Sequence, residues 1–265
     1  MGGLLSYTRL RQRTGAKSGT KGAEPLAAYT GQMPTDPLST NHLPMSDDFD
    51  RHSYENVFSR LAPLNVTYPI PWGEYVGAWI ALSYRFYSCA EYSDSFTESL
   101  QTHGGTAQAL ERYRQERDLY NFFVSGLSAI ESFYYGLFAI ASMLDSNNFP
   151  IQTAAAKKSI TPGRVVEKFL ARFEDENVTI TMQDLLNDQK YREWNDRRNI
   201  LAHRITPGRR MSITVTMGTD DSDYGPLRWG EIYLDERTTP SRRRWLAETL
   251  RHLLSAADTF TATRF

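Results

Sequence analysis

The fold of this chain is decided by residues 119–144, which read LYNFFVSGLSAIESFYYGLFAIASML. Nearly every side chain in this run is apolar or small, and its one charged residue is Glu131. A run of this length could cross a bilayer as a helix, but a carboxylate near the middle of such a span is costly in lipid. Small residues at four-residue steps, Ser128, Ser132 and Gly136, would let another helix approach closely. We therefore expect the central helix of a soluble bundle and no membrane contact.

The composition is that of a globular protein. Hydrophobic residues occupy 40% of the 265 positions and aromatic residues 12%, which is enough for a packed core. The net charge of -1 excludes attraction of the whole molecule to nucleic acid, so any such contact must come from a local patch. Cys89 is the single cysteine, which excludes an internal disulfide and fits a reducing, cytoplasmic compartment.

Helical periodicity extends on both sides of the central segment. The spacing of Tyr75, Trp79, Leu82 and Phe86 predicts a helix from residue 72 to about 101, and the central helix should run from about 106 to 144. Further helices are expected at about 165–175, from Met182 or Asp188 to Ile205, and from Pro240 to about Phe260. The short segment 178–180 is left unassigned.

Two other parts of the chain lack a helical period. Residues 1–65 are rich in Gly, Pro, Ser and Thr, which predicts an extended or disordered N-terminal arm. Residues 211–217 alternate and are β-branched, and we expect them to pair with residues 228–234 across a polar loop. The predicted fold is mainly α, an antiparallel helical bundle with a small β-hairpin insertion at about 211–234 and an extended arm.

One face of the helix that ends near Ile205 is polar where a bundle helix is usually apolar. At about 100° per residue, Asn195, Arg198, Asn199, Ala202 and His203 fall on this face. The apolar residues beside it, Trp194 and Leu201, can anchor the helix to the core. This face is the strongest candidate for a chemical site.

Two neighbouring arginines on this helix differ in their local partners. Arg197 has Glu193 one turn earlier, which is a favourable order for a helical ion pair. Arg198 has Trp194 and Ala202 at the equivalent positions, so it is free for another role. The structural alternative is that Arg198 lies over Trp194 as a cation–π pair.

The helix with Arg198, Asn199 and His203, following the earlier segment 129–138 (AIESFYYGLF), resembles the HEPN superfamily. Its members are helical bundles, and many are metal-independent ribonucleases of toxin–antitoxin and phage-defence systems. Their signature is an Arg followed by four to six residues and a His, often with Asn, Asp or His directly after the Arg. The resemblance covers roughly residues 72–260 and implies a helical domain within residues 66–265.

The resemblance implies an endoribonuclease with Arg198 and His203 as the catalytic pair and Asn199 in support. RNA can be cleaved by attack of its own 2′-hydroxyl on the adjacent phosphate. His, with an ordinary pKa of ~6.5, suits the proton transfers, and the planar fork of Arg suits the phosphate. This chemistry needs no metal and no cofactor. The family pattern also implies a homodimer with the active site at its interface, and a possible antitoxin protein as a further partner.

Other charged residues are candidates for supporting roles. Glu131 needs a partner in so apolar a helix, either Arg198 or His203, with Arg164 or Arg172 as structural alternatives, and Asn195 can assist the pair. Six arginines near the motif or at the start of the last helix are candidate RNA contacts: Arg204, Arg209, Arg210, Arg242, Arg243 and Arg244. The rival interpretation is a non-catalytic helical dimer that binds RNA or a protein through the same surface.

Overall fold

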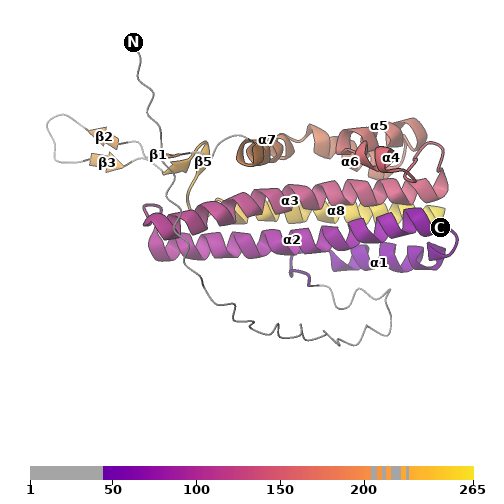
Figure 1. Ribbon diagram of the computed structural model, residues 1–265, viewed down its shortest axis with the longest axis horizontal. Helices are drawn as coiled ribbons and strands as arrows, with labels where there is room; N and C mark the ends of the chain where they lie inside the picture. The colour runs from indigo at the N-terminus through magenta and orange to yellow at the C-terminus, as the bar shows by residue number, and fades with distance from the viewer. Residues whose placement is uncertain (1–43, 204–207, 211–212, 216–221, 225–226) are drawn as a thin grey trace, which may run out of the picture. The chain divides into compact units, whose positions relative to one another are not determined.

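The computed structural model describes residues 44–203, 208–210, 213–215, 222–224 and 227–265. The described chain is mainly α-helical, as predicted, with short antiparallel strands between the last two helices (Figure 1). Residues 1–43, most of the predicted arm, and Arg204 lie outside the described residues.

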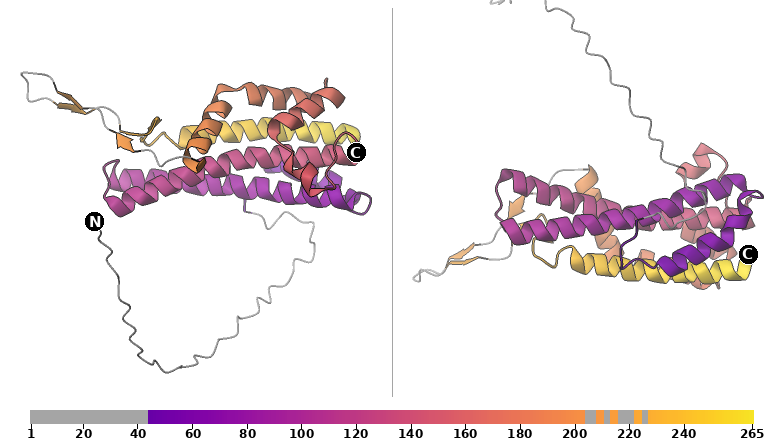
Figure 2. Two further views of the ribbon diagram at one scale, coloured as in Figure 1. Left: turned by 45° about the horizontal axis from the view of Figure 1, so that its top comes forward. Right: turned by 90° about the horizontal axis from the view of Figure 1, so that it is seen from below.

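The bundle is built on two long helices, α2 (Pro69–His103) and α3 (Ala109–Leu144), which lie side by side (Figures 1 and 2). Pro69 and Pro71 start α2, and Gly104, with φ of 65°, ends it in a conformation that favours glycine. At Gly136 a Cβ would lie 3.0 Å from Trp79 Cε3, so this small residue of α3 lets the indole of α2 pack closely. Both helices were predicted to within a few residues.

Helix α3 has the only window, among the described residues, that is long and apolar enough to cross a membrane. Within the bundle, 78% of that window is buried. Its apolar surface is therefore covered by neighbouring helices, as expected for a core helix.

The predicted arm is wrong for residues 51–65. Helix α1 (Arg51–Leu61) and a 3-10 turn, η1 (Ala62–Asn65), occupy them. Asp50 caps α1 by accepting a hydrogen bond from the Ser53 amide. The apolar face of α1 packs against α8 (Pro240–Arg264), the predicted last helix. Arg60 ties the two helices together through Asp258 at 2.8 Å. Four buried apolar side chains at helical spacing outweigh the Pro- and Gly-rich context: Tyr54, Val57, Phe58 and Leu61.

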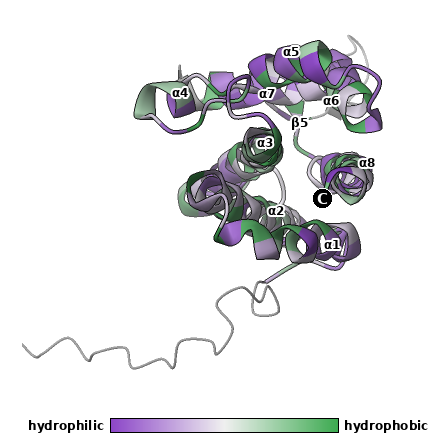
Figure 3. Cartoon of the chain, turned by 90° about the vertical axis from the view of Figure 1, so that its right-hand side faces the viewer, coloured by the Kyte–Doolittle hydropathy of each residue, from purple (hydrophilic) through white to green (hydrophobic). Residues whose placement is uncertain are grey.

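A layer of shorter helices lies over α3 and α8 (Figure 3). It comprises α4 (Ala154–Lys158), α5 (Pro162–Arg172), α6 (Asn177–Asn187) and α7 (Gln189–His203). The unassigned segment 178–180 belongs to the first turn of α6. Asp188 separates α6 from α7 because its backbone is extended, with ψ of 132°. Of the two predicted starts of the helix that carries the motif, Met182 and Asp188, the later one is therefore correct.

The strands pair differently from the prediction. β1 (Arg209–Arg210), β4 (Arg228–Trp229) and β5 (Ile232–Tyr233) form a three-stranded antiparallel sheet in the order β1-β4-β5. β2 (Ile213–Val215) pairs with β3 (Ser222–Tyr224), which lies within the expected polar loop. The predicted pairing of residues 211–217 with 228–234 is therefore wrong for the described residues: β2 pairs with β3, whereas β4 pairs with β1 and β5.

Candidate functional site

Helix α7 is held on the core by Trp194, which is 2% exposed. The indole stacks on Phe122, with ring centroids 5.1 Å apart, and contacts Phe123 and Trp245. Its Nε1 donates a hydrogen bond of 2.9 Å to the carbonyl oxygen of Phe123. These contacts confirm Trp194 as the anchor of the helix and fix the polar face beside α3.

Arg198 reaches from α7 to the carboxylate of Glu131 on α3. Its Nη2 lies 3.1 Å from Glu131 Oε1 and 3.4 Å from Asn195 Oδ1. Its Nε is buried and has no hydrogen-bond partner within the described residues. Of the partners expected for Glu131, Arg198 is the one observed, whereas Arg172 pairs with Asp145.

The cation–π alternative for Arg198 is not what the structure shows. The rings around Trp194 are aromatic neighbours from α3 and α8, and the cation–π pairs found among the described residues involve other cations. The expected pair of Arg197 with Glu193 is present at 3.8 Å. The two arginines thus differ in their partners as predicted.

Tyr191 completes the group around Glu131. Burial and the negative charge of Glu131 together raise the pKa of its phenol to about 12, against the opposing effect of Arg198. The phenol is therefore neutral near pH 7 and can donate a hydrogen bond. Sequence reasoning missed this residue because tyrosines are common in the chain and nothing in the sequence places this one beside Glu131.

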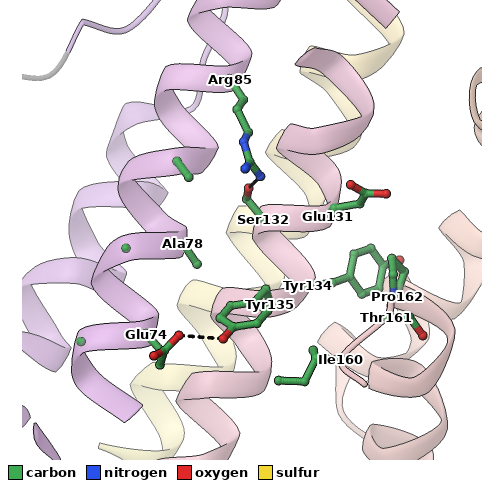
Figure 4. A pocket seen from close by; sticks show the side chains of 13 residues that line it. Glu74, Ala78, Arg85, Glu131, Ser132, Tyr134, Tyr135, Ile160, Thr161 and Pro162 are labelled. Carbon is green, nitrogen blue, oxygen red and sulfur yellow. Dashed lines mark hydrogen bonds between the residues drawn. The ribbon is translucent and has the colours of Figure 1, made fainter. Parts of the chain in front are cut away.

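A cavity of about 560 Å³ lies between α2, α3 and the start of α5, and Glu131 forms part of its wall (Figure 4). Across it, Arg85 donates hydrogen bonds to the carbonyl oxygen of Ser128, at 3.0 Å, and to Ser132 Oγ. At its other end, Tyr135 donates a hydrogen bond to Glu74 at 2.7 Å. Glu131 thus lies at a junction between this cavity and Arg198.

Glu74 is an ionised carboxylate in this setting. Burial alone would raise its pKa, but hydrogen bonds from Lys157 and Tyr135 outweigh that effect and lower it. The sequence did not single out Glu74 or Arg85. The available signal was the spacing of Gly73, Gly77 and Ala81 with Arg85, which puts small side chains and a cation on one face of α2.

The two motif residues lie at opposite edges of the polar face. Helix α7 extends to His203, whose side chain is outside the described residues. A separation of five residues on a regular helix turns two side chains apart by about 140° and sets them about 7.5 Å apart along the axis. Positions 198 and 203 of a regular helix therefore face different directions. Asn199, between them, is half-buried.

The arginines predicted to contact RNA have diverse environments. Arg209 is 7% exposed and bonded to Glu116 and to the carbonyl oxygens of Gly105 and Arg112, so this structural residue is unavailable to phosphate, contrary to the prediction. Arg242 pairs with Glu193, and Arg243 pairs with Asp48 and Asp94. Arg210 and Arg244 are exposed.

Metal ligands are not assembled in the part of the chain that the structure describes, where no three His, Cys, Asp or Glu side chains form a group that could hold an ion. The described centre consists instead of a guanidinium, a carboxylate, an amide and a phenol. Comparison of the chain with protein-family models, curated proteins and solved structures found no match.

Proposed function

We propose that this protein is a metal-independent endoribonuclease of the HEPN type, with Arg198 and His203 as its essential pair. The observation that supports it most is the setting of Arg198. Glu131 and Asn195 both accept hydrogen bonds from Nη2 of the guanidinium, while Nη1 makes no hydrogen bond within the described residues. A guanidinium in this state is oriented in advance and retains a donor for a phosphoryl oxygen.

The proposed reaction is an attack by the RNA on itself. The 2′-hydroxyl oxygen bonds to phosphorus as the bond from phosphorus to the 5′ oxygen breaks, which leaves a 2′,3′-cyclic phosphate. A neutral imidazole of His203 accepts the hydroxyl proton, and a protonated imidazole supplies the proton taken by the leaving oxygen. Arg198 stabilises the charge that builds on the phosphoryl oxygens, and Asn199 orients the phosphate or the imidazole.

A homodimer fits this chemistry better than a single chain. The step uses both a base and an acid, and each chain carries one motif histidine. The divergence of about 140° between the motif positions also disfavours their convergence within one helix. We infer that two copies of the polar face of α7 meet in one cleft, so that Arg198 of one chain acts with the partner's His203.

The biological setting is part of the same proposal. A ribonuclease of this type would act in the cytoplasm as a toxin or phage-defence component. An antitoxin protein that covers the polar face of α7 would keep it inactive until it is needed.

Cleavage of mixed RNA by purified protein in EDTA tests the proposal. We expect the wild-type protein to cut, and His203→Ala to lose roughly a hundred- to ten-thousand-fold in rate. Arg198→Ala should be similarly impaired. Arg192→Ala is the matched control, because this exposed arginine of α7 bonds only to the Asn187 carbonyl oxygen among the described contacts.

The products carry a second readout. Cyclic phosphate ends would support attack by the 2′-hydroxyl, and an RNA methylated at that oxygen should resist cutting. Cleavage by none of the proteins, or by wild type and both motif variants equally, would contradict the proposal. RNA affinity without cleavage would favour the rival interpretation, a helical dimer that only binds.

A further inference from the structure

A second cavity, of about 310 Å³, adjoins the C-terminal part of α7 and belongs to a different part of α3 from the first. Its walls are Tyr113, Glu116, Arg117 and Tyr120 of α3, Leu201 of α7 and Trp229 of β4. Leu201 lies two residues before His203, so the cavity is beside the motif end of α7. Its volume is at the lower end of those that hold small ligands.

Exposed aromatic rings line this cavity. Tyr113 is 61% exposed and Tyr120 is 36% exposed, although large aromatic side chains are usually buried. The side chain of Arg117, between them, is 46% exposed and is fixed by Asp118 at 2.7 Å. Positions i, i+4 and i+7 share one helix face, so two aromatic rings and a guanidinium plane are presented together. This combination binds unpaired bases by stacking.

Trp229 supplies a hydrogen-bond donor that has no acceptor among the described residues. Its side chain is 2% exposed and its Nε1 has no partner within the described residues. A buried indole N–H normally has an acceptor, and the cavity that Trp229 lines is where one could enter. The carbonyl oxygens and ring nitrogens of nucleobases are acceptors of this kind.

The charges around the cavity suit a polyanion. Glu116 faces two guanidinium groups, that of Arg112 at 2.9 Å and that of Arg209 at 3.0 Å. This carboxylate of the cavity wall therefore faces two cations, of which Arg112 is exposed and Arg209 is buried. The neighbouring Arg210 is exposed, so the positive charge continues onto β1.

The accessible face of α3 connects this cavity with Glu131. Tyr113 and Glu131 are separated by 18 residues, which is five helical turns, so they point the same way about 27 Å apart. Val124 and Ser128, between them on that face, are half-buried rather than buried. A strand that follows this face from the tyrosines would arrive at the carboxylate that holds Arg198.

We propose that this second cavity binds an unpaired nucleobase of single-stranded RNA, which stacks on Tyr113 and Tyr120 and accepts a hydrogen bond from Trp229 Nε1. The inference rests on the proposed function for the identity of its ligand as RNA. It adds a specificity: the substrate is single-stranded on one side of the cut.

Binding of a labelled single-stranded oligonucleotide that is 2′-O-methylated throughout tests this, because it cannot be cut by 2′-hydroxyl attack. Tyr113→Ala and Tyr120→Ala should each weaken binding roughly five- to 150-fold, and Phe at either position should retain it. The control is Tyr84→Ala, which removes a tyrosine of α2 that is 46% exposed. Trp229→Phe should weaken binding of the full oligonucleotide but not of one with abasic positions.

The outcomes separate the two proposals. Equal affinity of the Tyr113→Ala, Tyr120→Ala and Tyr84→Ala variants would overturn the base site, as would binding of a duplex as tightly as the single strand. No binding of the oligonucleotide by wild type would also overturn it and would point to a protein ligand for these rings. If the Tyr113→Ala and Tyr120→Ala variants bind and cleave like wild type while Arg198→Ala does not cleave, the proposed nuclease activity is supported and the proposed base site is not. If binding depends on the two tyrosines but wild-type protein does not cleave unmodified RNA, the proposed base site is supported and the proposed nuclease activity is not.

Discussion

At the scale of single residues, the pair between Arg198 and Glu131 explains the one carboxylate in the apolar part of α3, residues 119–144. Arg198 supplies a countercharge to the Glu131 carboxylate at 3.1 Å. The side chains are 23% and 36% exposed, so water still screens the attraction. The pair is better suited to orienting the guanidinium than to stabilising the fold.

We therefore expect Glu131→Ala to affect cleavage more than stability. Loss of the orienting carboxylate should lower the rate of RNA cleavage by up to about a hundredfold, because small displacements of a phosphate-binding group are costly. The free energy of unfolding in urea should fall by no more than about 1 kcal/mol. Glu131→Gln, which keeps an acceptor, should retain more activity than Glu131→Ala.

The control for this variant is Glu176→Ala, which breaks a similarly exposed ion pair with Arg264 far along the chain from the motif. The free energy of unfolding of Glu176→Ala should fall by as little as that of Glu131→Ala, and its rate of RNA cleavage should equal that of wild type. A Glu131→Ala protein that cleaves RNA like wild type would show that Arg198 does not need its carboxylate partner.

The sequence predicted this pair but missed other parts of the site for physical reasons. A lone carboxylate between apolar neighbours signals its need for a cation, so Arg198 could be named as a partner. Tyr191 and Trp229 carry no such signal, because their importance comes from which groups the tertiary fold brings near them. The prediction for Arg209 was wrong for the same reason: its charge indicated a phosphate contact, whereas the tertiary fold buries the side chain against Glu116.

At the scale of elements, the close contact between α3 and α7 sets the position of the motif. Gly126 of α3 lies under the indole of Trp194, and a Cβ there would come within 2.5 Å of Trp194 Cζ2 and 3.2 Å of Cys89 Sγ. Neither neighbour can move freely, because both are buried in the core. The absence of a side chain at this position allows α7 to approach.

Gly126→Ala should accordingly destabilise the protein by about 1–3 kcal/mol, since it overpacks a filled core. The matched control is Gly77→Ala on α2, where a Cβ would meet nothing within 4 Å. That substitution should stabilise the protein by up to about 1 kcal/mol through helix propensity. Urea unfolding of both variants measures the difference, and equal stabilities would refute the described packing of α7.

The helices that the sequence predicted well are those with long apolar periods, namely α2, α3 and α8. Helix α6 was missed at its start because Val178, Thr179 and Ile180 are β-branched residues that favour strands locally. Tertiary contacts decide the outcome there, since Val178 and Thr179 are fully buried. The strand register could not be predicted, because several short alternating segments compete for partners.

At the scale of the whole molecule, the proposed active site needs two chains. If Arg198 of one chain acts with the partner's His203, then two inactive variants can complement each other. Mixing Arg198→Ala with His203→Ala under conditions that exchange subunits should restore cleavage, because half of the dimers are mixed and each holds one Arg198 facing the partner's His203. The restored rate should stay below about a quarter of the wild-type rate, because the mixed cleft lacks the second histidine.

Each variant alone should stay inactive, and a mixture of the His203→Ala protein with itself is the control. Sedimentation or light scattering should show that the variants remain dimers. An inactive mixture of demonstrably exchanged dimers would contradict the proposed action of Arg198 with the partner's His203. A monomeric wild-type protein that cleaves RNA would remove the need for a second chain.

The packing of α1 on α8 has a consequence for how the protein is made. Residues of α8 cover α1, α2, α3 and α6, so none of these helices has its full set of neighbours until the last described helix has left the ribosome. A nascent chain that lacks α8 exposes apolar surface and cannot hold α7 firmly through the contact of Trp194 with Trp245. Synthesis itself would thus delay any RNA-cutting activity at least until α8 has been made.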